Sequence, residues 1–307
     1  MEGILPLYKP RGMTSHDCVF KLRKILRMKR IGHTGTLDPE VDGVLPICLG
    51  RATKVAEYIT DAGKTYEGEV TIGFSTTTED AGGEVVKSKL VEREFSRDEI
   101  LACLANLTGE ITQTPPMFSA VKVNGKRLYE YARQGIEIER PSRQVTIYDI
   151  ELLDERQCFE GETISFRFRV SCSKGTYIRT LAVMIGEELG YPAHMSDLTR
   201  IKSAQITLED CITLEDVEKL TAEGSIERVL RPIESALYYL PKYEISDKLI
   251  EKVKNGAALP IPDEFINEKG PIVVETPDGT ALAIYQAHPL KEGLMKPTKV
   301  LKIQENS

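Results

Sequence analysis

The 307-residue chain contains no tryptophan and only four histidines, which stand far apart in the sequence. Its six cysteines are also scattered, and no two of them have the close spacing that zinc sites and redox pairs use. We therefore expect no metal site and no disulfide framework, and we expect the thiols to be reduced. The sequence also lacks a P-loop and a G-x-G-x-x-G turn after a strand, so no nucleotide cofactor is expected.

Long hydrophobic segments are missing as well. No run of about eighteen apolar residues occurs, and the N-terminus lacks the pattern of a signal peptide, so we expect a cytoplasmic protein without membrane contact. The hydrophobic content of 41% and the charged content of 28% are those of an ordinary globular protein. The length suffices for two domains and a large core.

Acidic residues are in excess, with a net charge of −7, but the charge is unevenly distributed. Between Tyr8 and Lys54 ten lysines and arginines stand against four acidic residues, whereas between Ile206 and Ser235 three stand against eight. Because phosphate binding depends on the local potential, the first segment can form a basic face for nucleic acid. A solvated helix surface is the alternative explanation of such a cluster.

The local patterns predict an α+β fold, because strands and helices do not alternate regularly. The predicted elements are a strand at 3–8, a helix capped by Thr14 or Ser15, a helix near 52–61, a strand at 66–74, a helix begun by the Ser96–Glu99 capping box, a strand at 164–172 and a helix at 177–189 closed by Gly190. We expect these strands to form a mixed, largely antiparallel central sheet flanked by helices.

Two segments differ from this pattern. Residues 119–143 carry six basic residues and two tyrosines, with a hairpin turn predicted at Asn124-Gly125. They form either an arm laid against RNA or an ordinary surface insertion. After a boundary at 232–241, a helix at 246–254 is predicted, followed by short β-like runs at 272–275, 281–285 and 300–303. These runs indicate a small β-barrel-like module.

The stretch from Gly32 to Val44 combines three glycines with a histidine and an Asp-Pro step. Glycines at this density allow positive φ and the close approach of a bulky ligand. Pro39 keeps Asp38 out of the helical region, so the Asp38 carboxylate stands on a loop. The alternative is a surface turn in which Asp38 only accepts hydrogen bonds from backbone amides.

Two further residues combine with Asp38 into one candidate site: Tyr66, near the start of a strand, and Arg179, where a strand leads into a helix. An arginine beside a buried aspartate keeps the carboxylate ionised, and an ionised aspartate is a nucleophile toward a sugar or a base. An aromatic ring facing it can stack on an extracted base. Taken singly, Tyr66 is equally consistent with a core tyrosine and Arg179 with a helix-surface charge.

Four motifs, in this order, resemble those of one family. They are Tyr8-Lys9-Pro10-Arg11-Gly12-Met13-Thr14-Ser15, Gly32-His33-Thr34-Gly35-Thr36-Leu37-Asp38-Pro39, Lys64-x-Tyr66 and Cys172-Ser173-Lys174-Gly175-Thr176-Tyr177-Ile178-Arg179. The family is the bacterial tRNA pseudouridine synthase B family, which isomerises uridine 55 in the T loop of tRNA. The resemblance extends from about residue 3 to the C-terminus, where the tail is similar to a PUA RNA-binding module.

The resemblance implies a role for each matching residue. Asp38 matches the catalytic aspartate that initiates cleavage of the N-glycosidic bond, at the ribose or at the base. Tyr66 matches the tyrosine that stacks on the target base, and Arg179 the arginine paired with the aspartate. His33 matches the residue that fills the space left by the flipped base. The other substrate-binding positions implied are Tyr177, Leu198, Lys9, Gly32, Thr34 and Lys174.

The resemblance also implies a pseudouridine-synthase fold, with a catalytic domain at 1–238 and a PUA-like RNA-binding domain at 241–307. It implies the T-stem loop of tRNA as substrate, no cofactor, no metal, no guide RNA and a monomer. Phe118 departs from the family pattern, in which a tyrosine is often found there, so any hydrogen bond of that hydroxyl is absent. Three alternatives stay open: a pure RNA-binding or chaperone protein, a guide-RNA-dependent relative, and a glycosidase that uses Asp38 and Asp42.

Overall fold

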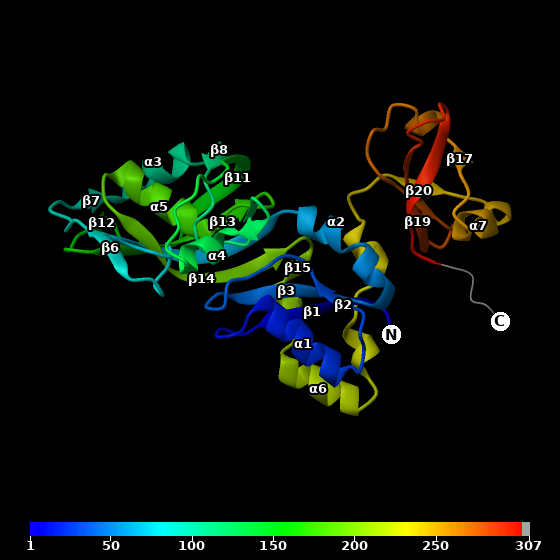
Figure 1. Ribbon diagram of the computed structural model, residues 1–307, viewed down its shortest axis with the longest axis horizontal. Coiled ribbons are helices and arrows are strands. Elements are labelled where there is room, and N and C mark those ends of the chain that lie inside the picture. Colours follow the sequence, from blue (N-terminus) through cyan, green and yellow to red (C-terminus); the bar gives the residue numbers. More distant parts are fainter. Residues whose placement is uncertain (303–307) are drawn as a thin grey trace.

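The computed structural model describes residues 1–302, and a nine-stranded sheet forms the centre of its larger part (Figure 1). The strand order is β1 (Gly3–Lys9), β3 (Asp42–Leu49), β14 (Ala193–Ser203), β4 (Lys64–Ile72), β13 (Ile164–Cys172), β11 (Arg143–Leu152) and β8 (Gly109–Gln113), with β2 (Ile31–His33) paired to β3 and β15 (Ile206–Thr207) paired to β14. Only β3 and β14 run parallel within this sheet, so the expected mixed, largely antiparallel sheet is confirmed.

Helices cover this sheet at both ends. Helix α5 (Ile178–Leu189) packs on β14 and β4, and α3 (Arg97–Asn106) packs on β11 and α5. At the other end α1 (Ser15–Ile25) packs on β2 and on α6 (Leu214–Ala222). The predicted caps are confirmed: Thr14 caps α1, Ser96 and Glu99 form a capping box on α3, and Gly190 ends α5 with φ +85°.

The predicted helix near 52–61 is divided into two pieces, η1 (Gly50–Lys54) and α2 (Ala56–Asp61), because Val55 leaves the helical conformation with ψ 4°. The remaining short elements are β5 (Phe74–Thr76), β6 (Val85–Ser88), β7 (Phe95–Ser96), β12 (Cys158–Phe159), η2 (Leu208–Asp210), η3 (Ile226–Val229), η4 (Ile233–Ala236) and η5 (Asp263–Phe265).

The C-terminal part is a separate curled sheet (Figure 1). Its strand order is β16 (Lys242–Glu244), β18 (Ile272–Glu275), β19 (Ala281–Ala287), β20 (Leu294–Val300) and β17 (Leu259–Pro260), and α7 (Asp247–Lys254) packs on β19. The prediction of a strand at 300–303 is wrong, because the last strand, β20, ends at Val300. Most residues of β20 are half-buried or exposed, so no alternation of apolar residues in the sequence indicates this strand. Residue 303 lies outside the described residues.

A shared hydrophobic cluster holds the C-terminal sheet against the central sheet. Val44 of β3 and Ile4 of β1 belong to the same buried cluster as Val273 and Ile284. An ion pair between Lys299 and Glu57, with 2.8 Å between Nζ and Oε1, joins the same two parts at the surface.

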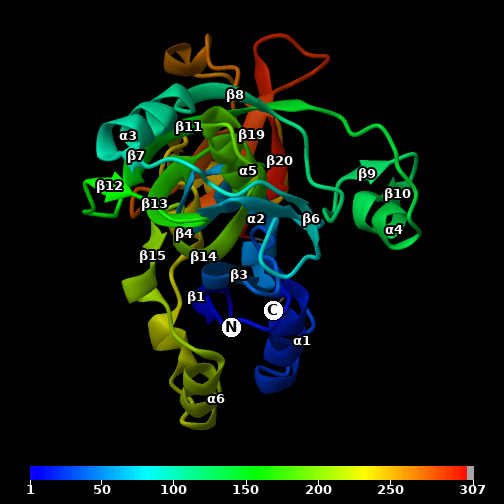
Figure 2. The same ribbon diagram turned by 90° about the vertical axis from the view of Figure 1, so that its left-hand side faces the viewer.

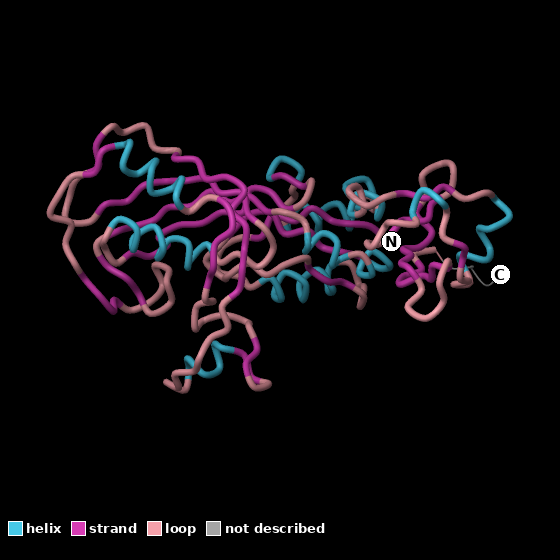
Figure 3. The backbone as a smooth tube through the Cα atoms, turned by 90° about the horizontal axis from the view of Figure 1, so that it is seen from above, coloured by secondary structure: helices cyan, strands magenta, loops and turns pink. Residues whose placement is uncertain are grey.

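The segment around 119–143 leaves the sheet as a projecting arm (Figures 2 and 3). It contains β9 (Lys122–Val123), β10 (Lys126–Arg127) and α4 (Leu128–Arg133). Asn124 and Gly125 both have positive φ, 50° and 85°, which confirms the predicted tight hairpin turn. The guanidinium groups of Arg127 and Arg133 lie over the ring of Tyr129, so the arm presents basic and aromatic groups together.

Gly43 marks the closest approach of β3 to β14. Its φ is +107°, and a Cβ at this position would lie 2.2 Å from the backbone oxygen of Arg200. We expect Gly43→Ala to lower the free energy of unfolding by about 3 kcal/mol, measured by urea denaturation, because the strands must separate. Gly12→Ala is the control, since Gly12 also has positive φ but has no atom within 4 Å of the added Cβ, and about 1 kcal/mol is expected there. Equal losses for the two variants would contradict the packing argument.

Candidate active site

A recess of about 680 Å³ lies between the central sheet, the start of α5, the Asp38 loop and the projecting arm. Strands β4 and β14 supply Tyr66 and Leu198 to its floor, and α5 and the turn before it supply Tyr177 and Arg179. All but three of the residues predicted for the site line this recess: Asp38, Tyr66, Arg179, His33, Tyr177, Leu198 and Lys174. Residues far apart in the sequence therefore meet at one place.

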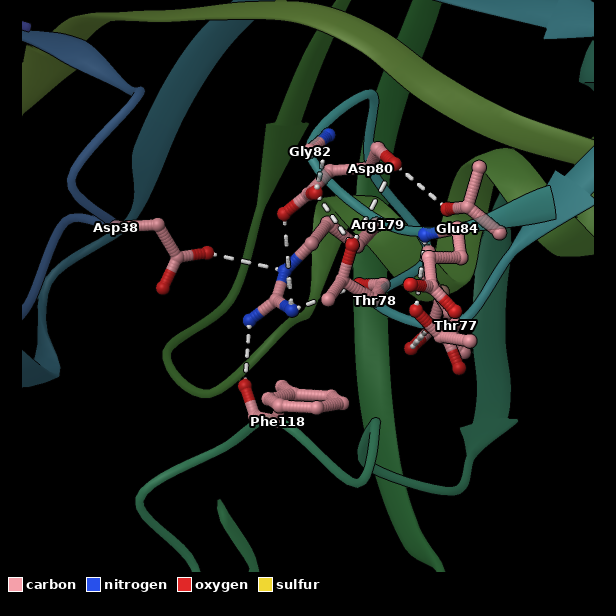
Figure 4. A network of polar contacts seen from close by, with 11 residues as sticks. Asp38, Thr77, Thr78, Asp80, Gly82, Glu84, Phe118 and Arg179 are labelled. Atoms are coloured by element: carbon pink, nitrogen blue, oxygen red, sulfur yellow. Dashed lines mark hydrogen bonds and ion pairs between the residues drawn. The ribbon is translucent and has the colours of Figure 1, made fainter. Parts of the chain in front are cut away.

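Asp38 and Arg179 form an ion pair in the recess, with 3.0 Å between Oδ2 and Nε (Figure 4). The other two nitrogens of Arg179 donate hydrogen bonds to backbone oxygens, Nη1 to Thr78 at 2.9 Å and Nη2 to Phe118 at 3.0 Å. The Arg179 side chain is 5% exposed, whereas the Asp38 side chain is 41% exposed. The guanidinium is thus fixed in the wall, and the carboxylate is presented to whatever enters.

A second carboxylate, Asp80, lies on the far side of Arg179. Its Oδ2 is 3.9 Å from Nη1, and its Oδ1 accepts hydrogen bonds from the hydroxyl of Thr78 and the backbone N–H of Gly82 (Figure 4). Asp80 was not predicted as a site residue, because a Thr-Glu-Asp turn has no pattern of its own that indicates a site. Asp80 helps to orient Arg179 and adds negative charge near Asp38.

The electrostatic surroundings make Asp38 more basic than an exposed aspartate. Withdrawal from bulk water raises the pKa of the Asp38 carboxyl, the positive charge of Arg179 opposes this rise, and Asp80 adds to it. A carboxylate of this kind is a better nucleophile once it is ionised, because basicity and nucleophilicity increase together. Its ionised form is held in a single orientation by the Arg179 Nε.

The three predicted residues outside the recess support the Asp38 loop. Lys9 is fully buried, and its ammonium donates to the backbone oxygens of Pro10, Pro39 and Val41 at 2.9, 3.1 and 2.6 Å. Thr34 is also fully buried, and both its N–H and its hydroxyl donate to the oxygen of Pro46. Gly32 pairs with Cys48 between β2 and β3. These positions shape the loop from behind and do not face the recess.

Gln113 fixes the opposite wall, and it too was not predicted as a site residue from the sequence. Its side-chain amide donates to the backbone oxygen of Tyr177 at 3.1 Å and accepts from the backbone N–H of Tyr177 at 2.9 Å. The guanidinium of Arg143 lies 4.9 Å from the centre of the Tyr177 ring. Lys174, at the rim, forms an ion pair with Asp61 at 2.9 Å, and Nδ1 of His33 is buried without a hydrogen-bond partner.

Residues 1–302 contain neither a metal-binding cluster nor a membrane-spanning helix. No group of three or more histidine, cysteine, aspartate or glutamate side chains in this range is arranged to hold a metal ion. No helix in the same range is long and apolar enough to cross a membrane.

Two protein-family models match adjacent segments of the chain. Residues 23–178 match the TruB family pseudouridylate synthase N-terminal domain, and residues 179–238 match the tRNA pseudouridylate synthase B C-terminal domain. The chain belongs to the TruB family of pseudouridylate synthases. The resemblance noted in the sequence is thereby confirmed, and the chain is an enzyme of the isomerase class.

Relatives and solved structures agree with membership of the TruB family. The tRNA pseudouridine synthase B of Geobacillus thermodenitrificans is 62% identical over 302 residues, which cover 98% of this chain and 100% of the relative. That of Bacillus pumilus is 58% identical over 309 residues and covers 100% of both chains. A chain in the crystal structure of a Cbf5-Nop10-Gar1 complex superposes with a TM-score of 0.73 at 31% identity, over 98% of this chain and 85% of that one. A chain of an H/ACA RNP bound to a substrate RNA containing 2'-deoxyuridine superposes with a TM-score of 0.72 at 27% identity, over 98% and 85%.

Proposed function

We propose that this TruB-family enzyme converts uridine 55 in the T loop of tRNA into pseudouridine, and that the Asp38–Arg179 pair carries the chemistry. The 3.0 Å ion pair at the mouth of an aromatic-lined recess is the observation that supports this most strongly. The names of the relatives that match the chain from end to end support tRNA as the substrate. The reaction replaces a C–N bond with a C–C bond inside one nucleotide, so it consumes no oxidant, reductant or nucleotide.

Binding must first remove the target base from its stack, which costs a few kcal/mol. The basic residues at the end of α1 and on the arm offset this cost through phosphate contacts, and their contribution falls as salt rises. In this proposal His33 fills the gap left in the RNA. Tyr66 stacks on the base, with Leu198 beside it and Tyr177 across the recess.

Chemistry then begins at Asp38, which attacks either C1′ of the ribose or the pyrimidine ring. The N1–C1′ bond breaks, the uracil rotates within the recess, and C5 bonds to C1′ before the C5 proton leaves. Arg179 holds the attacking oxygen in place and keeps Asp38 ionised. Once the RNA fills the recess, bulk water, which would otherwise compete for the ribose, is excluded from it.

We assign residues 1–238 to the catalytic domain and residues 241–307 to a PUA-like RNA-binding domain. In this proposal the enzyme acts as a monomer in the cytoplasm, without a guide RNA. A stand-alone enzyme is favoured over a guide-dependent one because identity to the tRNA pseudouridine synthase B relatives is 62% and 58%, against 31% to the chain of the Cbf5-Nop10-Gar1 complex.

The direct test is to incubate the purified protein with an unmodified tRNA transcript and no additives, and to map pseudouridine by carbodiimide modification and primer extension. One new stop at position 55 is expected. A transcript with cytidine at that position is the control and should give no stop. Modification at other positions only, or none at all, would overturn the proposal.

The acid limb of the pH profile is a further prediction. Only ionised Asp38 is a nucleophile, so the single-turnover rate should rise with pH through the pKa of Asp38 and then level off. Because burial raises that pKa, the midpoint should lie above the value of about 3.9 for an exposed aspartate. This midpoint is obtained from single-turnover rates at saturating enzyme between about pH 4 and about pH 8, with RNA binding followed in parallel. A midpoint at or below the ordinary value would contradict the described environment.

A further inference from the structure

Two cations in the floor of the recess have no acidic partner among residues 1–302. The Arg200 side chain is 1% exposed and Lys64 is 8% exposed, and neither forms an ion pair among residues 1–302. Arg200 Nε donates to the backbone oxygen of Val44 at 2.7 Å, but its Nη2 is buried and finds no hydrogen-bond partner in the described part of the chain. Since buried donors are nearly always paired in folded proteins, an unpaired guanidinium nitrogen needs a functional explanation.

The strand register brings these cations next to Tyr66. Arg200 on β14 is the direct partner of Tyr66 on β4, and Lys64 lies two residues before Tyr66 on the same strand. Directly opposite residues, and residues two apart on a strand, point to the same face of a sheet. All three side chains line the recess. A base stacked on Tyr66 therefore lies beside Arg200.

The Asp38 loop covers the same two cations from above. A Cβ added at Gly35 would lie 3.5 Å from Cε of Lys64 and 3.7 Å from Nη1 of Arg200. Lys64 donates to the backbone oxygens of Thr60 and Ala62 at 2.8 and 3.1 Å, which leaves its third N–H free. Burial, the charge of Arg200 and, to a smaller extent, the charge of Lys174 lower the pKa of Lys64 to about 8, although Cys172 and Asp61 act in the opposite direction. The two side chains thus lie next to each other beneath the Asp38 loop, at the lining of the recess.

Two desolvated cations side by side destabilise a folded protein unless an anion joins them. Donors that are fixed before the reaction and aimed at a developing negative charge are a strong source of rate acceleration. The missing partner is therefore expected to be an oxygen that becomes negative only during the reaction.

We propose that Arg200, assisted by Lys64, forms a subsite for a carbonyl oxygen of the target uracil while the ring carries negative charge. This rests on the proposed isomerisation. If Asp38 attacks C1′, the electron pair of the N1–C1′ bond moves into the ring and onto its carbonyl oxygens. If Asp38 attacks C6, the pair of the C5–C6 double bond moves toward O4. On either route the N1–C1′ bond breaks with its electron pair on the base, and C5 uses a ring electron pair to bond to C1′. The bond from Asp38 to C1′ or to C6 breaks and returns its pair to the carboxylate. The C5 proton leaves to solvent and N1 takes up one proton, so the net change is an isomerisation, and Arg200 keeps its own protons throughout.

The test compares uridine with 5-fluorouridine at the target position of a T-arm RNA, in single-turnover consumption of the nucleoside. Fluorine withdraws electrons and stabilises the ring anion without help from the protein. Arg200→Gln should slow the consumption of uridine about 10²- to 10³-fold and leave the Kd for the RNA within a factor of about three. The same variant should slow 5-fluorouridine at least about tenfold less. Lys64→Met should also slow the consumption of uridine more than that of 5-fluorouridine, but by smaller factors than Arg200→Gln.

The comparison of two substrates separates a subsite from a merely structural role. A structural defect would slow both nucleosides by the same factor, and that result, or an unchanged rate with uridine, would overturn the proposal. Arg200→Lys, which can still donate to Val44, gives the same comparison if Arg200→Gln does not fold. Arg169→Gln is the matched control, because Arg169 lies on β13 in ion pairs with Glu67 and Glu151, outside the recess. An inactive wild-type protein would instead count against the isomerisation itself.

Discussion

Asp38→Asn is expected to abolish pseudouridine formation, with the single-turnover rate falling by a factor on the order of 10⁴ or more. Asparagine keeps the size of the side chain but removes both the charge and the nucleophilic oxygen. Because shape is retained and the phosphate contacts lie elsewhere, the Kd for tRNA should change little. Release of tritium from 5-tritiated uridine in a T-arm transcript measures the reaction, and filter binding measures the affinity.

Asp42→Asn is the matched control for this experiment. Asp42 is a neighbouring carboxylate, but it accepts hydrogen bonds from Tyr8, Arg11 and Thr199 and does not line the recess. It should retain most of the activity, whereas a glycosidase using both carboxylates would lose activity with either change. Tritium release at the wild-type rate from Asp38→Asn would refute the assignment of Asp38 as the nucleophile, whereas no release from the wild type would favour a protein that only binds RNA.

The position of Asp38 was predictable because its determinants are local. Pro39 and the neighbouring glycines act on the backbone within a few residues, and the structure places the loop as they indicate. The partners of Arg179 were not predictable in this way. Its guanidinium is held by the Thr78 and Phe118 oxygens, which lie 101 and 61 residues away in the sequence. Only the packing of the sheet brings such groups together.

Lys9 and Arg200 show a second limit of sequence patterns. A charged residue on a strand suggests a solvent-exposed face, yet both side chains are fully buried. Lys9 is buried because its ammonium donates hydrogen bonds to the backbone oxygens of Pro39 and Val41 on the Asp38 loop and of the adjacent Pro10. Arg200 is buried because Gly43 lets β3 close over β14. Both causes depend on which segments become neighbours, and no local pattern contains that information.

Arg179→Lys is expected to lower the single-turnover rate by about 10²- to 10³-fold, with tRNA affinity largely kept. The guanidinium binds in three directions at once, with Nε to Asp38, Nη1 to Thr78 and Nη2 to Phe118. A lysine ammonium is a point charge and cannot occupy all three positions, so the Asp38 carboxylate loses its fixed orientation even though a positive charge remains.

The control for this substitution is Arg11→Lys. Arg11 also bridges two carboxylates, those of Asp42 and Asp197, but its side chain is 44% exposed and lies outside the recess. There an ammonium can replace the guanidinium with little loss, because exposed ion pairs contribute about 1 kcal/mol or less. Urea unfolding of both variants shows whether either loses stability. If Arg179→Lys reacts within about threefold of the wild type, charge alone suffices, and the three-way geometry described for Arg179 does not limit catalysis.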